Sequence, residues 1–86
     1  MRLLTLNGKC NACGARVRKA REALGLSQEQ LAAQVQLHGH GLTQKAVSRI
    51  ENGERIVPDF EIPLLAAALR VSPLWLLGIE EGPESE

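Results

Sequence analysis

The sequence predicts an all-α protein with a single hydrophobic core. Hydrophobic residues make up 44% of the chain, which favours a folded globule over a disordered segment. Leucine and alanine dominate these residues, and Phe60 and Trp75 are the only aromatic ones. Because strands usually draw on aromatic and β-branched residues, this composition favours helices. Apolar residues also recur at helical spacing in five successive segments.

The first helix combines an apolar face with a cluster of positive charge. Val17, Ala20 and Leu24 recur at positions i, i+3 and i+7, which places them on one side of a helix. Gly25 can end this helix in the left-handed conformation. The basic residues of the segment must face water or a partner, and they are Arg16, Arg18, Lys19 and Arg21.

The second helix has the clearest start signal. Ser27 and Gln30 have the spacing of a capping box, in which the two residues satisfy each other's backbone N–H groups. Leu31 and Val35 then lie four residues apart on one apolar face. We expect the helix to end near Leu37, because two of the next four residues are glycine.

The third helix is expected to begin after Thr43, a suitable N-cap, and to end at the Asn52–Gly53 pair. Ala46, Val47 and Ile50 form a stripe that faces the core. The opposite side of this helix is polar and carries Gln44, Lys45, Ser48 and Arg49.

Two further helices complete the predicted fold. The fourth starts near Asp59 and accommodates Pro63 in its first turn. Its buried residues are expected to be Ile62, Leu65, Ala66 and Leu69. The fifth is short, with Ser72 as N-cap, Pro73 in the first helical position and Gly78 as the stop.

The 86 residues are enough for one small domain and too few for two. We expect this domain over residues 14–78, after an N-terminal extension over 1–13 and before an acidic tail over 79–86. The first dozen residues and the last five are expected to be loose ends. The longest apolar run, Leu64–Leu69, is far shorter than the ~20 residues of a membrane span, and the start lacks a signal-peptide pattern. We therefore expect a soluble cytoplasmic protein with no membrane partner.

The formal net charge is zero, but the two halves of the chain differ. Residues 1–49 contain eight basic and two acidic residues, and residues 50–86 contain two basic and eight acidic ones. Such an asymmetry suggests one basic face, which attracts phosphate even on a neutral protein. The alternative is a set of solvated helix faces with no partner.

The second and third helices, joined by a glycine-containing turn, predict a helix-turn-helix, which sets its second helix into the DNA major groove. The polar side of the third helix suits this task. The amide of Gln44 can pair with adenine, and Lys45 or Arg49 can reach the acceptors of guanine. The positive N-terminal ends of both helices also favour phosphate.

Three ordered segments, Arg18–Ala32, Val47–Gly53 and Leu65–Gly78, resemble the Cro and phage-repressor family of helix-turn-helix regulators, also described as the xenobiotic response element type. The resemblance covers roughly residues 14–78. It implies a compact five-helix repressor-like DNA-binding domain. In that family the third helix reads operator DNA, usually as a symmetric dimer.

The resemblance also implies roles for single residues. Gln28 stands where the family contacts a phosphate and braces the first recognition residue. The positions that read bases are Gln44, Lys45 and Arg49, with Thr43 and Ser48 alongside. The positions that contact the DNA backbone are Asn52, Arg16, Arg18 and, in the loop after the third helix, Arg55.

Two further positions have structural roles by resemblance. Arg21 and Glu51 match an ion pair that ties the first helix to the third. Trp75 matches the closing helix, which in phage repressors contributes both to the core and to the dimer contact, so the residue is either a core filler or an exposed dimer anchor.

Two features depart from the family pattern. The connection from Val35 to Thr43 is about five residues longer than the family's short turn, so Gln36–Gly41 is an insertion, which could lengthen the second helix and swing its glycine-rich tip toward DNA or a partner. The loop after the third helix keeps a single basic residue, Arg55, where phage repressors often have several. This reduction predicts a lower affinity for phosphate.

Cys10 and Cys13 have the Cys-x-x-Cys spacing, which serves half a zinc site, a redox pair or two ordinary thiols. A structural zinc ion needs four ligands, and the available additions are His38 and His40, whose spacing is atypical. No βαβ pattern accompanies the motif, so a thioredoxin-like role is not supported. We expect two reduced thiols, with no metal and no cofactor.

These observations predict a sequence-specific DNA-binding transcriptional regulator, which binds a palindromic operator as a homodimer. The alternative is a protein-interaction module of the same fold, of the antitoxin or adaptor kind, motivated by the insertion and the acidic C-terminal portion. We expect no enzyme, because no nucleophile–base pair, phosphate-cradling loop or complete metal set can be assembled from the sequence.

Overall fold

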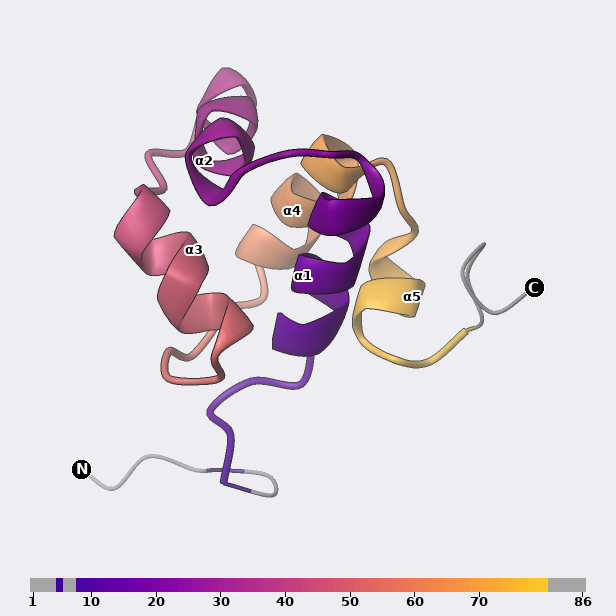
Figure 1. The fold of residues 1–86 in the computed structure, drawn as a ribbon. Helices are drawn as coiled ribbons and strands as arrows, with labels where there is room; N and C mark the ends of the chain where they lie inside the picture. Colours follow the sequence, from indigo (N-terminus) through magenta and orange to yellow (C-terminus); the bar gives the residue numbers. More distant parts are fainter. Residues whose placement is uncertain (1–4, 6–7, 81–86) are drawn as a thin grey trace.

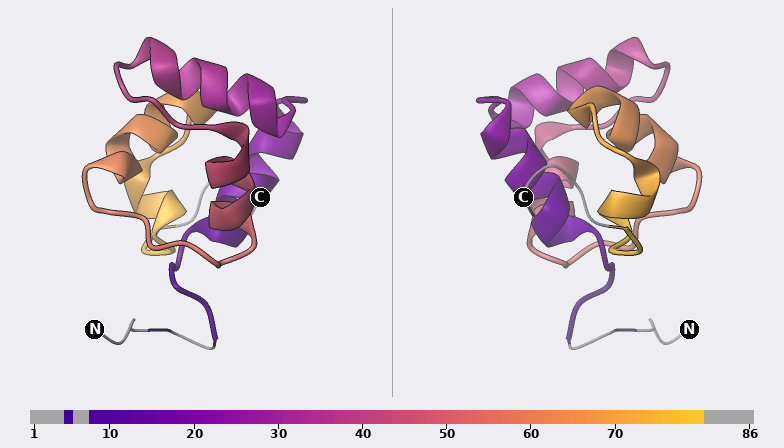
Figure 2. Two further views of the ribbon diagram at one scale, coloured as in Figure 1. Left: turned by 90° about the vertical axis from the view of Figure 1, so that its left-hand side faces the viewer. Right: turned by 90° about the vertical axis from the view of Figure 1, so that its right-hand side faces the viewer.

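The computed structural model describes Thr5 and residues 8–80, and it confirms an all-α fold with five helices (Figure 1). The helices, in chain order, are α1 (Gly14–Ala23), α2 (Gln28–Leu37), α3 (Gln44–Glu51), α4 (Glu61–Leu69) and α5 (Pro73–Leu76). Helix α1 lies between α3 on one side and α5 on the other (Figure 1). The views in Figure 2 show α2 and α4 closing the remaining sides of the core.

The predicted start signals are present. The Ser27 hydroxyl accepts from the backbone N–H of Gln30, whose side chain accepts from the N–H of Ser27, so the capping box is complete. Thr43 caps α3 by accepting from the N–H of Ala46 at 3.1 Å. Ser72 caps α5, which has a proline in its first turn. These local contacts explain why the starts of α2, α3 and α5 could be predicted from the sequence.

Two predicted boundaries differ from the structure. Helix α1 ends at Ala23, so Leu24 lies beyond it and is 40% exposed instead of completing the apolar face. The chain turns away there because Gly25 takes the left-handed conformation, with φ of 71°. Helix α4 begins at Glu61 and not near Asp59, because the residues before it form a turn in which the N–H of Glu61 bonds to Pro58.

All five helices contribute to one core. Its fully buried aliphatic residues are Val17, Leu31, Val35, Leu42, Val47, Ile50, Leu65, Leu69 and Leu76. Trp75 is only 4% exposed, so it fills the core and is not an exposed anchor. The guanidinium carbon of Arg16 lies 5.9 Å from the centre of the Trp75 ring, a cation–π contact that covers the indole from the side of α1.

The described part of the N-terminal extension is tied to the domain and is not loose. The N–H of Cys10 donates to the carbonyl of Gly53 at 2.8 Å, and Cys13 is buried in the core. The segment therefore packs against the end of α3 before α1 begins. The rest of the expected loose ends, residues 1–4, 6–7 and 82–86, lies outside the described residues.

The insertion lengthens α2 as far as Leu37, and the loop that follows turns inward. The Gln36 amide donates to the carbonyl of Leu42, whose side chain is buried. The imidazole of His40 bonds to Glu61 at the start of α4. His40 therefore does not follow the expectation that the glycine-rich tip swings toward DNA or a partner, because its side chain bonds within the fold; for the exposed Gly39 and Gly41 it stays a prediction.

Across the described residues, we find no helix that is both long enough and apolar enough to cross a bilayer.

Candidate nucleic-acid interface

Helix α3 presents its polar side to solvent, as the sequence predicts. Successive residues of an α-helix are about 100° apart, so Val47 and Ile50 share one side and both are buried against α1 and α2. The opposite side is formed by exposed residues, Gln44, Lys45 and Arg49, and by the half-buried Ser48. These side chains stand at the outer edge of the molecule and are free to meet another macromolecule.

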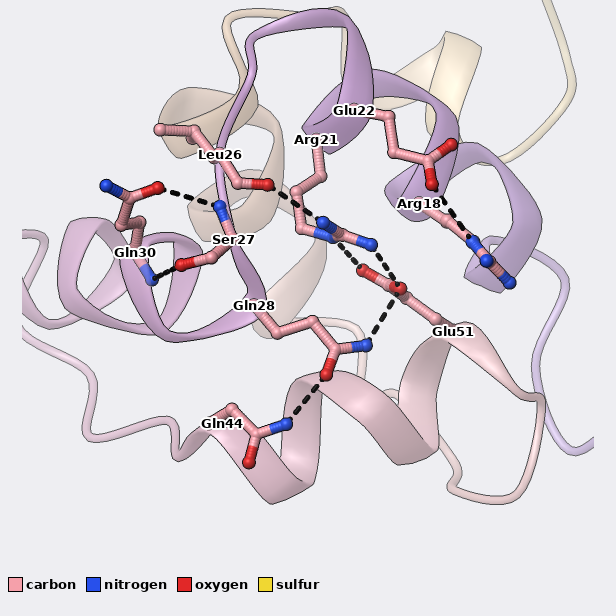
Figure 3. Close-up of polar contacts among 9 residues, drawn as sticks. All are labelled: Arg18, Arg21, Glu22, Leu26, Ser27, Gln28, Gln30, Gln44 and Glu51. Atoms are coloured by element: carbon pink, nitrogen blue, oxygen red, sulfur yellow. Dashed lines mark hydrogen bonds and ion pairs between the residues drawn. The ribbon is translucent and has the colours of Figure 1, made fainter.

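The first residue of α3 is held by the first residue of α2. The Gln44 amide donates to the side-chain oxygen of Gln28 at 2.7 Å (Figure 3). The Gln28 amide in turn donates to Glu51 at 3.1 Å. This chain of bonds leaves the Gln44 oxygen and one of its N–H groups for a further partner. The predicted bracing of Gln44 by Gln28 is thus present in the protein without DNA.

The ion pair implied by the resemblance is present between α1 and α3. Arg21 donates to both oxygens of Glu51, from Nε at 2.6 Å and from Nη2 at 3.1 Å, and its Nη1 donates to the carbonyl of Leu26 (Figure 3). The side chains are 12% and 2% exposed, so the pair is largely buried. The hydrogen bond to Glu51 raises the pKa of Arg21 above its ordinary value. The pair therefore remains charged and fixes α3 against α1.

The two basic residues at the start of α1 lie on different sides. Arg16 is on the side that faces α5, where it covers Trp75. Arg21 reaches α3 from the other side, and Arg18 lies closer to it on the helix surface than Arg16 does, by the 100° spacing. Arg18 makes an exposed ion pair with Glu22 at 3.4 Å. Arg18 thus lies nearer than Arg16 to the α3 side of α1, and the DNA contacts of both residues stay predictions.

Arg55 is half-buried and is bonded within the fold. Its Nη1 and Nη2 donate to the two oxygens of Glu61, at 2.6 and 2.9 Å. The hydrogen bond to Glu61 raises the pKa of Arg55. Burial alone would raise the pKa of Glu61, but the bonds from Arg55 and His40 outweigh it and lower that pKa. The guanidinium of Arg55 thus neutralises a buried carboxylate in the protein without DNA, and its contact with DNA stays a prediction.

Asn11, which the sequence analysis did not single out, holds the C-terminal end of α3. Its amide donates to the carbonyls of Ile50 at 3.1 Å and Arg55 at 2.8 Å, and its oxygen accepts from the N–H of Gly14. A Cβ atom at Gly14 would clash with the Ile50 carbonyl, so the absence of a side chain allows α1 to approach α3. An asparagine three residues before a helical glycine was the signal available for this contact.

Lys9 is a second residue that the sequence analysis missed. Its ammonium donates to the carbonyl of Asn52 at 3.3 Å, and its aliphatic carbons lie against Gly53. Asn52 is exposed at the end of α3, as its predicted backbone-contacting role requires. A positive charge thus stands beside this position, which no local pattern in the sequence revealed.

The four side chains considered as zinc ligands, Cys10, Cys13, His38 and His40, do not form a metal site in the structure. In the part of the chain that the structure describes, no three histidine, cysteine or carboxylate side chains are arranged to hold a metal ion. His40 is bonded to Glu61, and Cys13 is buried while Cys10 is partly exposed. Burial raises the pKa of the Cys13 thiol to about 11, which keeps it protonated at neutral pH. Both cysteines are free thiols in this structure.

The chain matches a protein family and several solved structures. A model of the Helix-turn-helix family matches residues 17–76. The restriction-modification controller protein C.AhdI from Aeromonas hydrophila, known from a crystal structure, has 41% sequence identity over 73% of this chain and 84% of its own. The TM-score of the two structures is 0.64. The c2 repressor protein of P22, solved in complex with synthetic operator 9T, is 28% identical over 81% of this chain and 98% of that one, with a TM-score of 0.68. No curated protein sequence matches significantly.

Proposed function

The chain belongs to the helix-turn-helix family, and from this premise we propose that it is a sequence-specific DNA-binding transcriptional regulator that places α3 in the major groove. One observation carries the proposal. The polar side of α3 is exposed, while hydrogen bonds among Arg21, Glu51, Gln28 and Gln44 fix the helix against α1 and α2. Such preorganisation is what recognition of base edges requires.

The side chains divide into those that read bases and those that contact phosphate. Gln44 can give adenine the two bonds that its N7 and N6 positions require, and Lys45 and Arg49 can donate to guanine. Thr43 and Ser48 stand alongside these base-reading residues, and the residues suited to the DNA backbone are Gln28, Asn52 and Arg18. Phosphate contacts set the register of α3 and base contacts set the sequence preference.

The two solved relatives support regulation at an operator. The P22 c2 repressor was solved on a synthetic operator, and C.AhdI is a restriction-modification controller protein. The fold that they share with this chain includes the helix pair α2–α3. The alternative of a protein-interaction module drew on the inserted loop and on the acidic C-terminal portion. The bond from His40 to Glu61 of α4 removes part of that loop from the surface that a protein partner would meet.

We also propose that the protein binds as a homodimer through α5. Apolar side chains of α5 and the residues after it remain exposed, with Leu74 at 46%, Leu77 at 41% and Ile79 at 68%. Helix α5 itself lies on the side of α1 opposite α3 (Figure 1). A dimer would place two copies of α3 on a palindromic operator with half-sites about one helical turn apart. Sedimentation of the Ile79→Lys variant is expected to show a monomer where the wild type is a dimer.

The function is tested by selection from random DNA duplexes. The purified protein is expected to enrich a palindrome, and its affinity for that duplex is expected to fall steeply with salt, because phosphate contacts release counterions. Gln44→Ala and Arg49→Ala should each lose about 1–3 kcal/mol of preference at one base position. The matched control is Gln34→Ala, an exposed glutamine of α2, which should bind as the wild type does.

Two results would contradict the proposal. The first is the absence of any enriched sequence from a folded protein. The second is an unchanged base preference in both the Gln44→Ala and the Arg49→Ala variants.

A further inference from the structure

The carboxylate of Glu61 joins the two loops that flank α3. The side chain of this first residue of α4 is 2% exposed. It accepts two bonds from Arg55, in the loop that follows α3, and its Oε2 atom lies 2.7 Å from Nε2 of His40, in the loop that precedes α3. One buried group therefore holds the chain on both sides of the helix.

The direction of the His40 bond follows from the charge of Glu61. The pKa of Glu61 is lowered, so its carboxylate is ionised at neutral pH and can only accept hydrogen bonds. Nε2 of His40 therefore carries a hydrogen atom and donates a hydrogen bond to Oε2 of Glu61. The ring also meets Phe60 edge to face, with the ring centres 5.7 Å apart, which limits its rotation.

Both loops are further constrained close to α3. Leu42, two residues after His40 and next to the N-cap of α3, is buried in the core. The carbonyl of Arg55 accepts from Asn11, which also bonds to Ile50 near the end of α3. These contacts lie within a few residues of the helix, so the bonds to Glu61 constrain the chain close to both ends of α3.

This link matters because the body of α3 packs against α1 and α2, whereas α4 lies on the other side of the core. The flanking loops supply the hydrogen-bonded connection between α3 and α4 through His40 and Arg55. Base recognition requires side chains placed within about 0.5 Å and 10–20° of the productive geometry. Loss of one flank would let α3 tilt without unfolding the core.

We propose that Glu61 and His40 are positioning residues for DNA recognition: the carboxylate sets the orientation of α3 by holding the inserted loop through His40 and the following loop through Arg55. The inference rests on the proposed function. It gives the insertion a task, which is to bring His40 onto α4 and so secure the N-terminal flank of the recognition helix.

The test compares three variants on two DNA duplexes. Binding of the selected duplex and of a scrambled duplex is measured by fluorescence anisotropy, at a temperature where circular dichroism shows each variant folded. His40→Ala should lower the ratio of selected to scrambled affinity about tenfold, the size expected for one lost base contact. His40→Gln should restore most of the ratio, because its amide N–H can donate to Glu61. His38→Ala, at an exposed position in the same loop, should match the wild type.

A readout without DNA makes the inference independent of affinity. In ¹⁵N-labelled protein, His40→Ala should keep the wild-type fold but shift the amide resonances of residues 44–51. His40→Gln should shift these resonances less. Glu61→Gln is a second route to the same result, since it keeps the shape of the side chain and removes its charge.

The outcomes separate this inference from the proposed function. If the wild type enriches no duplex, the proposed function fails before any variant is compared. If the wild type binds its duplex, the inference is overturned by a His40→Ala variant with an unchanged ratio. This includes a variant whose affinities for both duplexes fall in the same proportion, because the ratio is then unchanged and His40 does not act on base recognition.

Discussion

Two buried carboxylates, Glu51 and Glu61, stand at the centre of similar polar networks with different consequences. Each accepts two hydrogen bonds from one guanidinium and a third from a further side chain, and each side chain is 2% exposed. Glu51 connects three helices and leads, through Gln28, to a residue at the exposed edge of α3. Glu61 connects two loops. The same chemistry thus fixes a side chain in one place and a backbone path in the other.

The largest difference between the networks should appear when the guanidinium is removed. Arg21→Ala leaves Glu51 buried and uncompensated and should cost about 3–5 kcal/mol of unfolding free energy. Arg55 is 28% exposed where Arg21 is 12%, and its partner keeps His40. Arg55→Ala should therefore cost less, about 1.5–3 kcal/mol. Urea denaturation of both variants measures the two values, and a larger loss for Arg55→Ala would contradict this ranking.

A second experiment separates the approach of the helices from the ion pair itself. Gly14→Ala places a methyl group against the Ile50 carbonyl, so α1 and α3 must separate near Glu51. The expected loss is about 1–3 kcal/mol, as for an overpacked interior. Gly41→Ala is the control, because open space surrounds that glycine in the inserted loop. Equal thermal stabilities of the two variants would show that the close approach is not needed.

The Glu61 network should also affect how the unfolding free energy changes at acidic pH. The folded-state pKa of Glu61 lies below its ordinary value, so its contribution to stability is present above that value and is lost as the pH falls through the folded pKa. Unfolding free energies of Glu61→Gln should therefore fall less steeply than those of the wild type between about pH 5 and pH 3. Arg55→Ala should also make the unfolding free energy fall less steeply in this pH range, because the bonds from Arg55 lower the pKa of Glu61. Parallel curves for all three proteins would refute the assignment.

The smallest effect is expected where the same types of residue pair in solvent. Arg18 and Glu22 are 58% and 57% exposed, and their atoms are 3.4 Å apart. Arg18→Ala should change the unfolding free energy by less than about 0.5 kcal/mol. The same variant should weaken binding to every duplex alike, since a phosphate contact carries no base preference. A stability loss near that of Arg21→Ala would show that burial does not determine the strength of these pairs.

The helices could be predicted from the sequence because their signals are local. Ser27 and Gln30 satisfy each other within one turn, and Thr43 caps its own helix. The polar side of α3 follows from helical periodicity alone. The Arg21–Glu51 pair spans 30 residues, and only the resemblance to a family indicated it.

The Glu61 network could not be predicted in the same way. Arg55 stands in a loop, where a basic residue suggests a phosphate contact, and its pairing depends on how that loop returns to α4. His40 lies in an insertion that the family pattern does not describe, and its partner comes 21 residues later. Arg16 shows the same difficulty, because its contact with Trp75 depends on where α5 packs. Tertiary approach decides such contacts, and no short-range spacing encodes it.

The turn at Gly39 offers a practical consequence of the inserted loop. Gly39 is exposed, has a φ of 88°, and has open space around it, while Leu42 and His40 hold the returning chain within the fold. A few added residues at this apex would lengthen a turn whose far side stays anchored. With Cys10 and Cys13 replaced, one cysteine introduced among the added residues could carry a single fluorophore there. The dye would report tumbling of the whole domain on a promoter fragment.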